Sequence, residues 1–320
     1  MPPIEVNQHN EIIDGWHRWT ANKKVNRETI KVFVTETNSD AELLEFAIAR
    51  NSTWGFQLTN EDKKDVARKI YHTTPERERD KKRKQLSKLL SVPERTLRDW
   101  LSRIDKDDKE KRDKSILELW MACYTFDEIA KLNGIHKDTV SEVCRKMADL
   151  PKSDKLSSEH LIDFEPPIYN VWKKKKKSDG QSHYGNSEVR WLDNLLYLYT
   201  QPFDIVVDPF AGGGTTIDIC KKRWRRYWVG DRIPIIEREN EIRKHDLVID
   251  KLPNLTGRWS DVHLIYLDPP YWKQAEGKYS NDPTDLGNMN LDDFTSNLAK
   301  IIRGFGKKMR NGYVNRAVFS

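Results

Sequence analysis

The sequence has few cysteines and no long apolar stretch, and each shortage excludes a class of protein. It holds 3 cysteines in 320 residues, at positions 123, 144 and 220. Their odd number and irregular spacing argue against a disulfide framework and against a zinc site, so we expect no metal and a reducing, cytoplasmic setting. No apolar signal segment opens the chain, and no stretch approaches the length of a membrane span. We therefore expect no membrane partner.

Net charge is also small. The 56 basic and 50 acidic residues leave a formal net charge of +6, although charged residues make up 33% of the chain. A strong positive field therefore requires that the basic residues cluster, and they do so at residues 77–83, 173–177 and 223–226. Clusters of this kind can neutralise nucleic-acid phosphates. The five-lysine run at 173–177 is more typical of a linker, with nucleic-acid contact as a secondary role.

One segment has the pattern strand, glycine turn, helix. Residues 205–207 are apolar and predict a central strand, DPFAGGGTT follows at 208–216, and residues 217–222 predict a helix. Glycine permits positive φ and close approach of the backbone to a ligand. The Gly-Lys-Ser/Thr ending of a P-loop is absent. The pattern instead indicates the cofactor end of an open α/β sheet, and Asp231 closes the next strand, where a ribose diol is usually bound.

A second strand ends in an unusual tetrapeptide. The apolar run 262–267 predicts a buried strand, and Asp268-Pro269-Pro270-Tyr271 follows it. Asp268 and the next carbonyl can both accept hydrogen bonds from an exocyclic amine, which aims the nitrogen lone pair. The prolines fix φ and supply no N–H, and Tyr271 offers a flat face for a base. The alternative reading is an ordinary strand end with a tyrosine in the core.

Together the two motifs resemble those of DNA methyltransferases that modify the amino group of adenine or cytosine. The resemblance implies S-adenosylmethionine as cofactor, with Asp208, Phe210, Gly212 and Gly214 around its methionine part. It implies that Asp231 binds the ribose and that Asp246, or Asp250 close by, reads the adenine amine. The catalytic residues would be Asp268, Pro269, Pro270 and Tyr271. His183 either lines the cofactor pocket or is a loop residue. No cysteine follows a proline, so the nucleophile of ring-carbon methylation is missing.

The middle of the chain carries two patterns typical of a helix-turn-helix. In residues 126–140, Ala130, Gly134 and Val140 have the spacing at which alanine lets two helices approach and glycine makes the turn. In residues 85–100, serine replaces both the alanine and the glycine. A generic helical hairpin is the alternative for each. If the segments bind DNA, the candidate contacts are Arg95, Arg98, His136, Lys137, Thr139 and Ser141.

The N-terminal region resembles the ParB-like nucleotide-binding superfamily through the segment IIDGWHRWTA at residues 12–21. This matches a strand followed by a Gly-x-x-Arg box that opens a helix. The resemblance implies that Gly15 and Arg18 lie at a nucleotide phosphate. The alternative is that Arg18 is a structural residue at the helix start. Trp16 and His17 occupy the place of the cysteine of the related sulfiredoxins, which excludes their redox chemistry.

These segments predict four parts. A ParB-like α+β domain covers residues 1–72, helix-turn-helix segments cover 73–112 and 113–160, and a Rossmann-like α/β methyltransferase sheet covers 161–320. Prolines at 166 and 167 and the stretch 173–180 mark the entry to the last part. After a helix at 291–303, the tail 312–320 is short and polar where a buried apolar strand is expected. We therefore expect a C-terminally truncated sheet.

The function predicted by this arrangement is methyl transfer to a DNA base amine. Only about fifty residues separate the two motifs, which leaves no room for a target-recognition domain, so we expect the N-terminal helices to hold the DNA. Two alternatives stay open: a DNA-binding protein with an inactive methyltransferase domain, and a methyltransferase of RNA or protein. The choice between adenine and cytosine, the recognition site and the oligomeric state are not decided by these residues.

Overall fold

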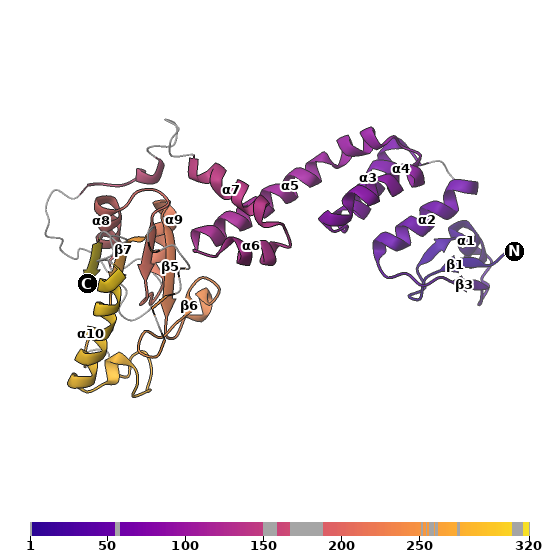
Figure 1. Ribbon diagram of the computed structural model, residues 1–320. Coiled ribbons are helices and arrows are strands. Elements are labelled where there is room, and N and C mark those ends of the chain that lie inside the picture. The colour runs from indigo at the N-terminus through magenta and orange to yellow at the C-terminus, as the bar shows by residue number, and fades with distance from the viewer. Residues whose placement is uncertain are drawn as a thin grey trace. The chain divides into compact units, whose positions relative to one another are not determined.

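The computed structural model describes residues 2–54, 58–149, 159–166, 188–250, 252–253, 255, 259, 262–273, 276–308 and 316–319. The chain divides into two compact units, Met1–Lys111 and Arg112–Ser320. Figure 1 colours both units by residue number. The expected linker at 173–180, the lysine run within it and His183 lie outside the described residues. The division falls inside the helix Glu94–Met121, and the four parts expected from the sequence stay a prediction.

The first unit begins with a three-stranded sheet. Its strands are β1 (Ile4–Val6), β2 (Ile12–Asp14) and β3 (Val32–Val34), in the order β2-β1-β3, with β1 antiparallel to β2 and parallel to β3. Helix α1 (Trp16–Lys24) follows β2 directly and starts at Gly15, whose φ is 99°. A Cβ at Gly15 would lie 2.7 Å from Ile4 Cγ2. The strand, glycine and helix therefore lie where the sequence predicted them.

Helices make up the rest of the first unit, and the last of them continues past Lys111 into the second unit. They are α2 (Asp40–Trp54), α3 (Asn60–His72), the 3-10 turn η1 (Glu76–Glu78), α4 (Arg79–Leu90) and α5 (Glu94–Met121). Helix α3 starts with a capping box in which Thr59 and Asp62 satisfy each other's backbone amides. Helix α4 ends at Ser91 in the left-handed conformation, φ 51°. The side chains of Ile70, Leu86 and Leu97 are buried where α3, α4 and α5 meet.

A helix pair follows α5 in the second unit. Helices α6 (Phe126–Asn133) and α7 (Lys137–Asp149) are joined at Gly134, which is left-handed with φ 63°. Thr125 and Glu128 form a capping box at the start of α6. Ile129 and Val140 are fully buried between the helices. The two helices and the glycine turn between them match the spacing in the sequence, and the 3-10 turn η3 (Glu159–Leu161) follows.

A five-stranded parallel sheet forms the rest of the second unit (Figure 1). Its strands are β4 (Ile205–Asp208), β5 (Arg226–Asp231), β6 (Arg243–Lys244), β7 (Val262–Leu267) and β8 (Arg316–Phe319). Their order is β6-β5-β4-β7-β8, and every neighbouring pair is parallel. The chain moves outward from β4 in one direction to β5 and β6 and in the other to β7 and β8. The β4–β7 boundary is therefore the switch point of the sheet, at whose carboxyl edge ligands bind.

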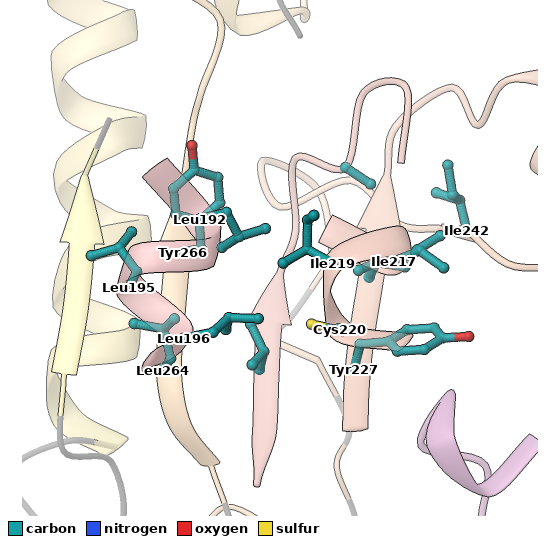
Figure 2. Close-up of a cluster of buried hydrophobic side chains, with 13 residues drawn as sticks. Leu192, Leu195, Leu196, Ile217, Ile219, Cys220, Tyr227, Ile242, Leu264 and Tyr266 are labelled. Atoms are coloured by element: carbon teal, nitrogen blue, oxygen red, sulfur yellow. The ribbon is translucent and has the colours of Figure 1, made fainter. Parts of the chain in front are cut away.

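Helices cover both faces of this sheet. They are α8 (Val189–Tyr199), α9 (Thr215–Lys222) and α10 (Leu291–Lys308), together with the 3-10 turns η4 (Ile236–Arg238) and η6 (Leu286–Asn288). Alternate strand residues point to opposite faces. Val207 and Ile265 pack with Phe305 of α10 on one face. The other face packs against α8 and α9, and Figure 2 shows Leu195, Leu196 and Leu264 among the buried side chains there.

The C-terminal tail differs from the expectation drawn from its polar sequence. Residues Arg316–Phe319 form β8, which pairs in parallel with β7 in the register Leu264↔Arg316 to Leu267↔Phe319. Backbone hydrogen bonds define a strand, and an edge strand does not need an apolar side chain at every position. The description of the tail as polar was therefore wrong for residues 316–319, three of which are apolar, whereas the expected truncation of the sheet stays a prediction. Among the described residues, no helix is long and apolar enough to cross a membrane.

Candidate active site

The glycine turn after β4 packs against the side chain of Arg238. Gly212 and Gly214 have positive φ, 50° and 83°, which a residue with a Cβ adopts at a cost. Gly214 starts α9, and a Cβ there would lie 2.9 Å from Arg238 Cδ. Arg238 donates to the Gly214 carbonyl at 3.2 Å and pairs with Asp218 at 2.8 Å. The sequence placed the glycines correctly but gave no sign of the arginine that packs against them.

Asp208 ends β4 and is almost completely buried, with 2% exposure. Its carboxylate accepts hydrogen bonds from the Phe210 amide at 3.0 Å and from the Thr216 hydroxyl. Burial, together with the charges of Asp268 and Asp231, raises the pKa of Asp208 to about 7, while the two hydrogen bonds oppose the shift. Asp208 therefore ties the strand end to the first turn of α9.

Asp231 ends the neighbouring strand β5 and connects two loops. One carboxylate oxygen accepts from the Gly212 amide at 2.9 Å, and the other accepts from the Ile233 amide at 3.0 Å. The Ala211 amide also donates to the Gly230 carbonyl at 2.9 Å. The glycine turn and the tip of β5 are thus held together by hydrogen bonds, with the Asp231 carboxylate between them.

Asp246 lies two residues after β6, at its carboxyl end. Its carboxylate accepts from the Val248 amide at 2.9 Å and lies 3.4 Å from Arg232 Nε. Asp250 accepts from the Asp246 amide at 2.8 Å. Asp246 contributes to the cavity described below, whereas Asp250 is not among the residues that line it. The geometry therefore favours Asp246 over Asp250 as a ligand-facing carboxylate.

The segment Asp268–Tyr271 comes directly after β7. Asp268 and both prolines are partly buried, and all described peptide bonds are trans. The side chain of Tyr271 is 53% exposed and that of Trp272 is 37% exposed. Trp272 Nε1 donates to the Met289 carbonyl at 3.1 Å, which fixes one edge of its ring. The reading of Tyr271 as a core residue is wrong, because its ring is open to solvent.

Both strand ends line one cavity of about 260 Å³. Strands β4 and β7 are parallel neighbours, so their carboxyl ends lie at the same edge of the sheet. Of the residues named from sequence, seven line the cavity: Asp208, Phe210, Gly212, Asp231, Asp246, Asp268 and Pro270. Gly214, Pro269 and Tyr271 belong to the same two turns without lining it. Further lining residues that the sequence reading missed include Arg232, Ile233, His245, Lys278, Tyr279 and Asp285.

The charge of this cavity is predominantly acidic. Five aspartates line it, at positions 208, 231, 246, 268 and 285, against Arg232, Lys278 and His245, and the raised pKa of Asp208, about 7, leaves that carboxyl only partly ionised near neutral pH. Apolar groups such as Phe210, Ile233 and Leu247 supply the rest of the wall. A ligand with positive charge and hydroxyl donors suits this lining better than a polyphosphate does.

The residues expected to contact DNA are exposed or half-buried. Arg95 and Arg98 are exposed on α5, in the first unit. His136 and Lys137 are exposed at the start of α7, where Lys137 pairs with Asp127 at 2.9 Å. Thr139 and Ser141 are half-buried. The basic segment 77–83 is partly neutralised, because Arg79 and Arg83 both pair with Asp105.

Gly15 and Arg18, named for a nucleotide, lie in the first unit. Arg18 donates to the carbonyls of Pro2 and Pro3 and pairs with Asp14 at 2.5 Å. The arginine therefore holds the N-terminal segment and β2 against α1. Nucleotide binding by this box stays a prediction, and the contacts of Arg18 correspond to its alternative structural role.

Comparison with known proteins gives the site a family. A family model of N6- and N4-methyltransferases, described as DNA methylase, matches residues 11–242. The chain belongs to this DNA methylase family. The matched range contains the glycine turn and Asp231, and it ends before Asp246 and Asp268.

One curated relative is similar over part of its length. The Type II methyltransferase M.BamHI of Bacillus amyloliquefaciens is 25% identical over 149 residues, which are 43% of this chain and 34% of that protein. The chain thus spans about a third of the length of this relative. No solved structure matches the chain.

Proposed function

We propose that this protein moves a methyl group from S-adenosylmethionine to the exocyclic amine of adenine or cytosine in DNA. One observation carries the proposal. The glycine turn after β4 and the Asp268 turn after β7 line a single acidic cavity at the switch point of the sheet. Membership of the DNA methylase family agrees with DNA as the substrate. The family match does not choose between adenine and cytosine.

The lining of the cavity fits an adenosyl sulfonium. When bound, this cofactor supplies a methyl group on a positively charged sulfur. The Gly212 backbone and Phe210 would enclose the methionine part of the cofactor. Asp208 would support them by holding the glycine turn in place. Asp231 would accept from the ribose hydroxyls, because its carboxylate lies at the tip of β5. Asp246 would accept from the adenine amine.

Asp268 would act on the base amine. Its carboxylate and the following backbone carbonyl would each accept a hydrogen bond from one N–H group of the amine. These two hydrogen bonds would turn the nitrogen lone pair away from the ring and toward the methyl group. The methyl group that the cofactor would supply would then face the lone pair of the amine, and Asp268 would accept the surplus proton of the amine and pass it to solvent. The prolines make the turn rigid, and Tyr271 stacks on the extruded base. Positioning and fixed dipoles supply the rate, without a covalent enzyme intermediate.

Of the two segments expected to bind DNA, the helix pair α6–α7 is the better candidate for placing DNA at this cavity. It belongs to the same compact unit as the sheet. The segment before α6 is bonded to the sheet, because Arg226 Nε donates to the Trp120 carbonyl at 3.2 Å and Arg243 Nη2 donates to the Ala122 carbonyl at 3.0 Å. DNA held by α7 would therefore have a fixed relation to Asp268. Arg95 and Arg98 would add contacts from the first unit.

Radiolabelled methyl transfer to DNA tests the chemical step. Asp268→Ala should reduce transfer at least about 1,000-fold, because it removes an acceptor that positions the amine. Calorimetric affinity for S-adenosylhomocysteine should change little. Asp107→Ala, an exposed aspartate of α5, is the control. Equal transfer by wild type and Asp268→Ala would refute the assigned role. Cofactor binding without any transfer by wild type would favour the alternative, a DNA-binding protein with an inactive methyltransferase domain.

DNA affinity at several salt concentrations tests the helix pair. Lys137→Ala should weaken binding about 3- to 10-fold and reduce the salt slope by about 1, as expected for one lost phosphate contact. Asp127→Ala is a matched control, because it breaks the same ion pair and keeps the lysine. Equal weakening by both variants would mean that the ion pair supports the fold and that Lys137 does not contact DNA. The variant Arg95→Ala/Arg98→Ala measures the contribution of the first unit.

A further inference from the structure

Arg232 joins three segments around the cavity. It comes directly after Asp231, at the tip of β5, and its side chain is 22% exposed. Its Nη2 donates to Asp282 Oδ2 at 2.6 Å and to Thr284 Oγ1 at 2.7 Å, while its Nε lies 3.4 Å from Asp246 Oδ2. One guanidinium thus links the ribose end, the adenine end and a segment that follows the Asp268 turn.

That segment, residues 276–290, is here called the wall segment. Asn288 holds it together: its Oδ1 accepts from the Gly277 amide, and its Nδ2 donates to the carbonyls of Ser280 and Asp282, each at 2.8 Å. The buried Asp285 accepts from the Ser280 hydroxyl at 2.8 Å and from the Gly287 amide at 3.0 Å. The wall segment is therefore a cross-linked loop that can respond as one body to a contact at Asp282.

The wall segment closes the same cavity that the cofactor would occupy. Lys278, Tyr279, Asp285 and Leu286 line it, as do Asp268 and Pro270. Asp282 is not among the lining residues, so its contact with the cavity runs through Arg232. The position of Asp282 therefore gives a way to disturb the wall segment without touching a ligand.

Arg232 also carries an unused donor. Its Nη1 is buried and has no hydrogen-bond partner among the described residues. Buried N–H groups of charged side chains are almost always paired, because an unpaired one costs free energy. Arg232 lines the cavity, so an acceptor on a bound ligand is a suitable partner. Ribose oxygens and adenine ring nitrogens are acceptors of this kind.

We propose that Arg232 is a positioning residue that couples cofactor binding to the wall segment. This inference rests on the proposed function. An acceptor of the bound adenosyl group pairs with Nη1 and orients the guanidinium, which then holds Asp282 and Thr284 more firmly. The wall segment beside Asp268 is consequently better ordered when the cofactor is present. By reciprocity, contacts that order the wall segment also raise affinity for the cofactor.

Hydrogen exchange on the full chain, with and without S-adenosylhomocysteine, tests the coupling. In wild type, saturating ligand should slow exchange in the wall segment at least about 10-fold. In Arg232→Met, exchange should be faster without ligand and should gain no protection from it. Arg232→Lys keeps the charge but cannot bridge three partners, so it should recover only part of the protection. Arg103→Met, on an exposed arginine of α5, is the control.

A double-mutant cycle separates coupling from a merely structural role. Asp282→Ala should lower affinity for S-adenosylhomocysteine about 3- to 10-fold, although Asp282 does not line the cavity. In the Arg232→Met background, the same change should have almost no further effect. Unchanged affinity in Asp282→Ala, or equal ligand protection in Arg232→Met and wild type, would overturn the coupling alone. Absence of S-adenosylhomocysteine binding to wild type would overturn both the proposed function and this inference.

Discussion

The two turns that line the cavity are built in opposite ways. The turn after β4 is closed by its own chain, because Asp208 bonds Thr216 and the Phe210 amide, and Asp231 bonds the Gly212 amide. The turn after β7 leaves Tyr271 53% exposed and Trp272 37% exposed. The polar groups of the turn after β4 are hydrogen-bonded within the fold, whereas the turn after β7 exposes aromatic side chains.

This difference matches the two ligands in the proposed reaction. A small cofactor gains affinity from a site that is already formed, because little has to be ordered on binding. A base that swings out of a duplex needs an open face on which to stack. Substitutions in the first turn should therefore act on stability and cofactor affinity, and substitutions in the second should act on DNA and on turnover.

The largest effect on this comparison is expected from Tyr271→Ala. Loss of base stacking should raise the KM for DNA about 10- to 100-fold, in line with about 1–3 kcal/mol for each stacked base. Stability and affinity for S-adenosylhomocysteine should stay near wild type, because the ring is half-exposed. Tyr271→Phe, which keeps the ring face, should retain most activity. Steady-state kinetics at varied DNA concentration make the measurement, and a large loss in both variants would exclude stacking as the cause.

A smaller effect, on stability, is expected from Gly214→Ala. A Cβ at φ 83° and 2.9 Å from Arg238 Cδ should cost about 1–3 kcal/mol of unfolding free energy. Gly306→Ala is the matched control, because a Cβ there meets nothing within 4 Å and lies in the helix α10. That control should stabilise by about 0.5–1 kcal/mol. Denaturant titration of both variants provides the comparison, and equal stability would show that the glycine turn tolerates side chains.

An effect of comparable size is expected in the pH dependence of stability. The pKa of Asp208 is about 7 in the fold, against an ordinary value of 3.8. Between these values the folded chain keeps a proton that the unfolded chain releases. The protonated Asp208 carboxyl therefore favours the folded state fully below about pH 4, and this contribution to the free energy of unfolding is lost as the pH rises through 7.

Asp208→Asn should remove this loss, on the order of 1–3 kcal/mol between pH 4 and 8. Thermal unfolding of both proteins across that range is the measurement, with Asp107→Asn as the control for an exposed carboxylate. Parallel pH profiles for wild type and Asp208→Asn would show that Asp208 is already ionised in the folded protein.

Much of the site could be predicted because its parts are local in sequence. The apolar runs at 205–207 and 262–267 lie in β4 and β7, since parallel strands that are buried on both faces are continuous apolar stretches. Gly134 joins α6 and α7 because a left-handed residue is needed there. Strand β6, by contrast, contains only Arg243 and Lys244 and has no apolar signal.

Contacts between distant segments could not be predicted in this way. Arg232 meets Asp282, which is 50 residues away, and Arg226 bonds the Trp120 carbonyl, which is 106 residues away. Neither pair has a spacing pattern, because long-range contacts depend on how strands and helices pack. The membership of α6 and α7 in the same unit as the parallel sheet is of this kind.

The sequence alone determined which chemical groups stand at the strand ends: glycines after β4, and a carboxylate, two prolines and an aromatic ring after β7. These follow from local preferences of backbone and burial. Only the tertiary structure decided that both ends line one cavity, because this depends on the parallel pairing of β4 with β7. It also decided that Tyr271 is open to solvent and that Arg232 reaches the wall segment, since both depend on packing between segments far apart in the chain.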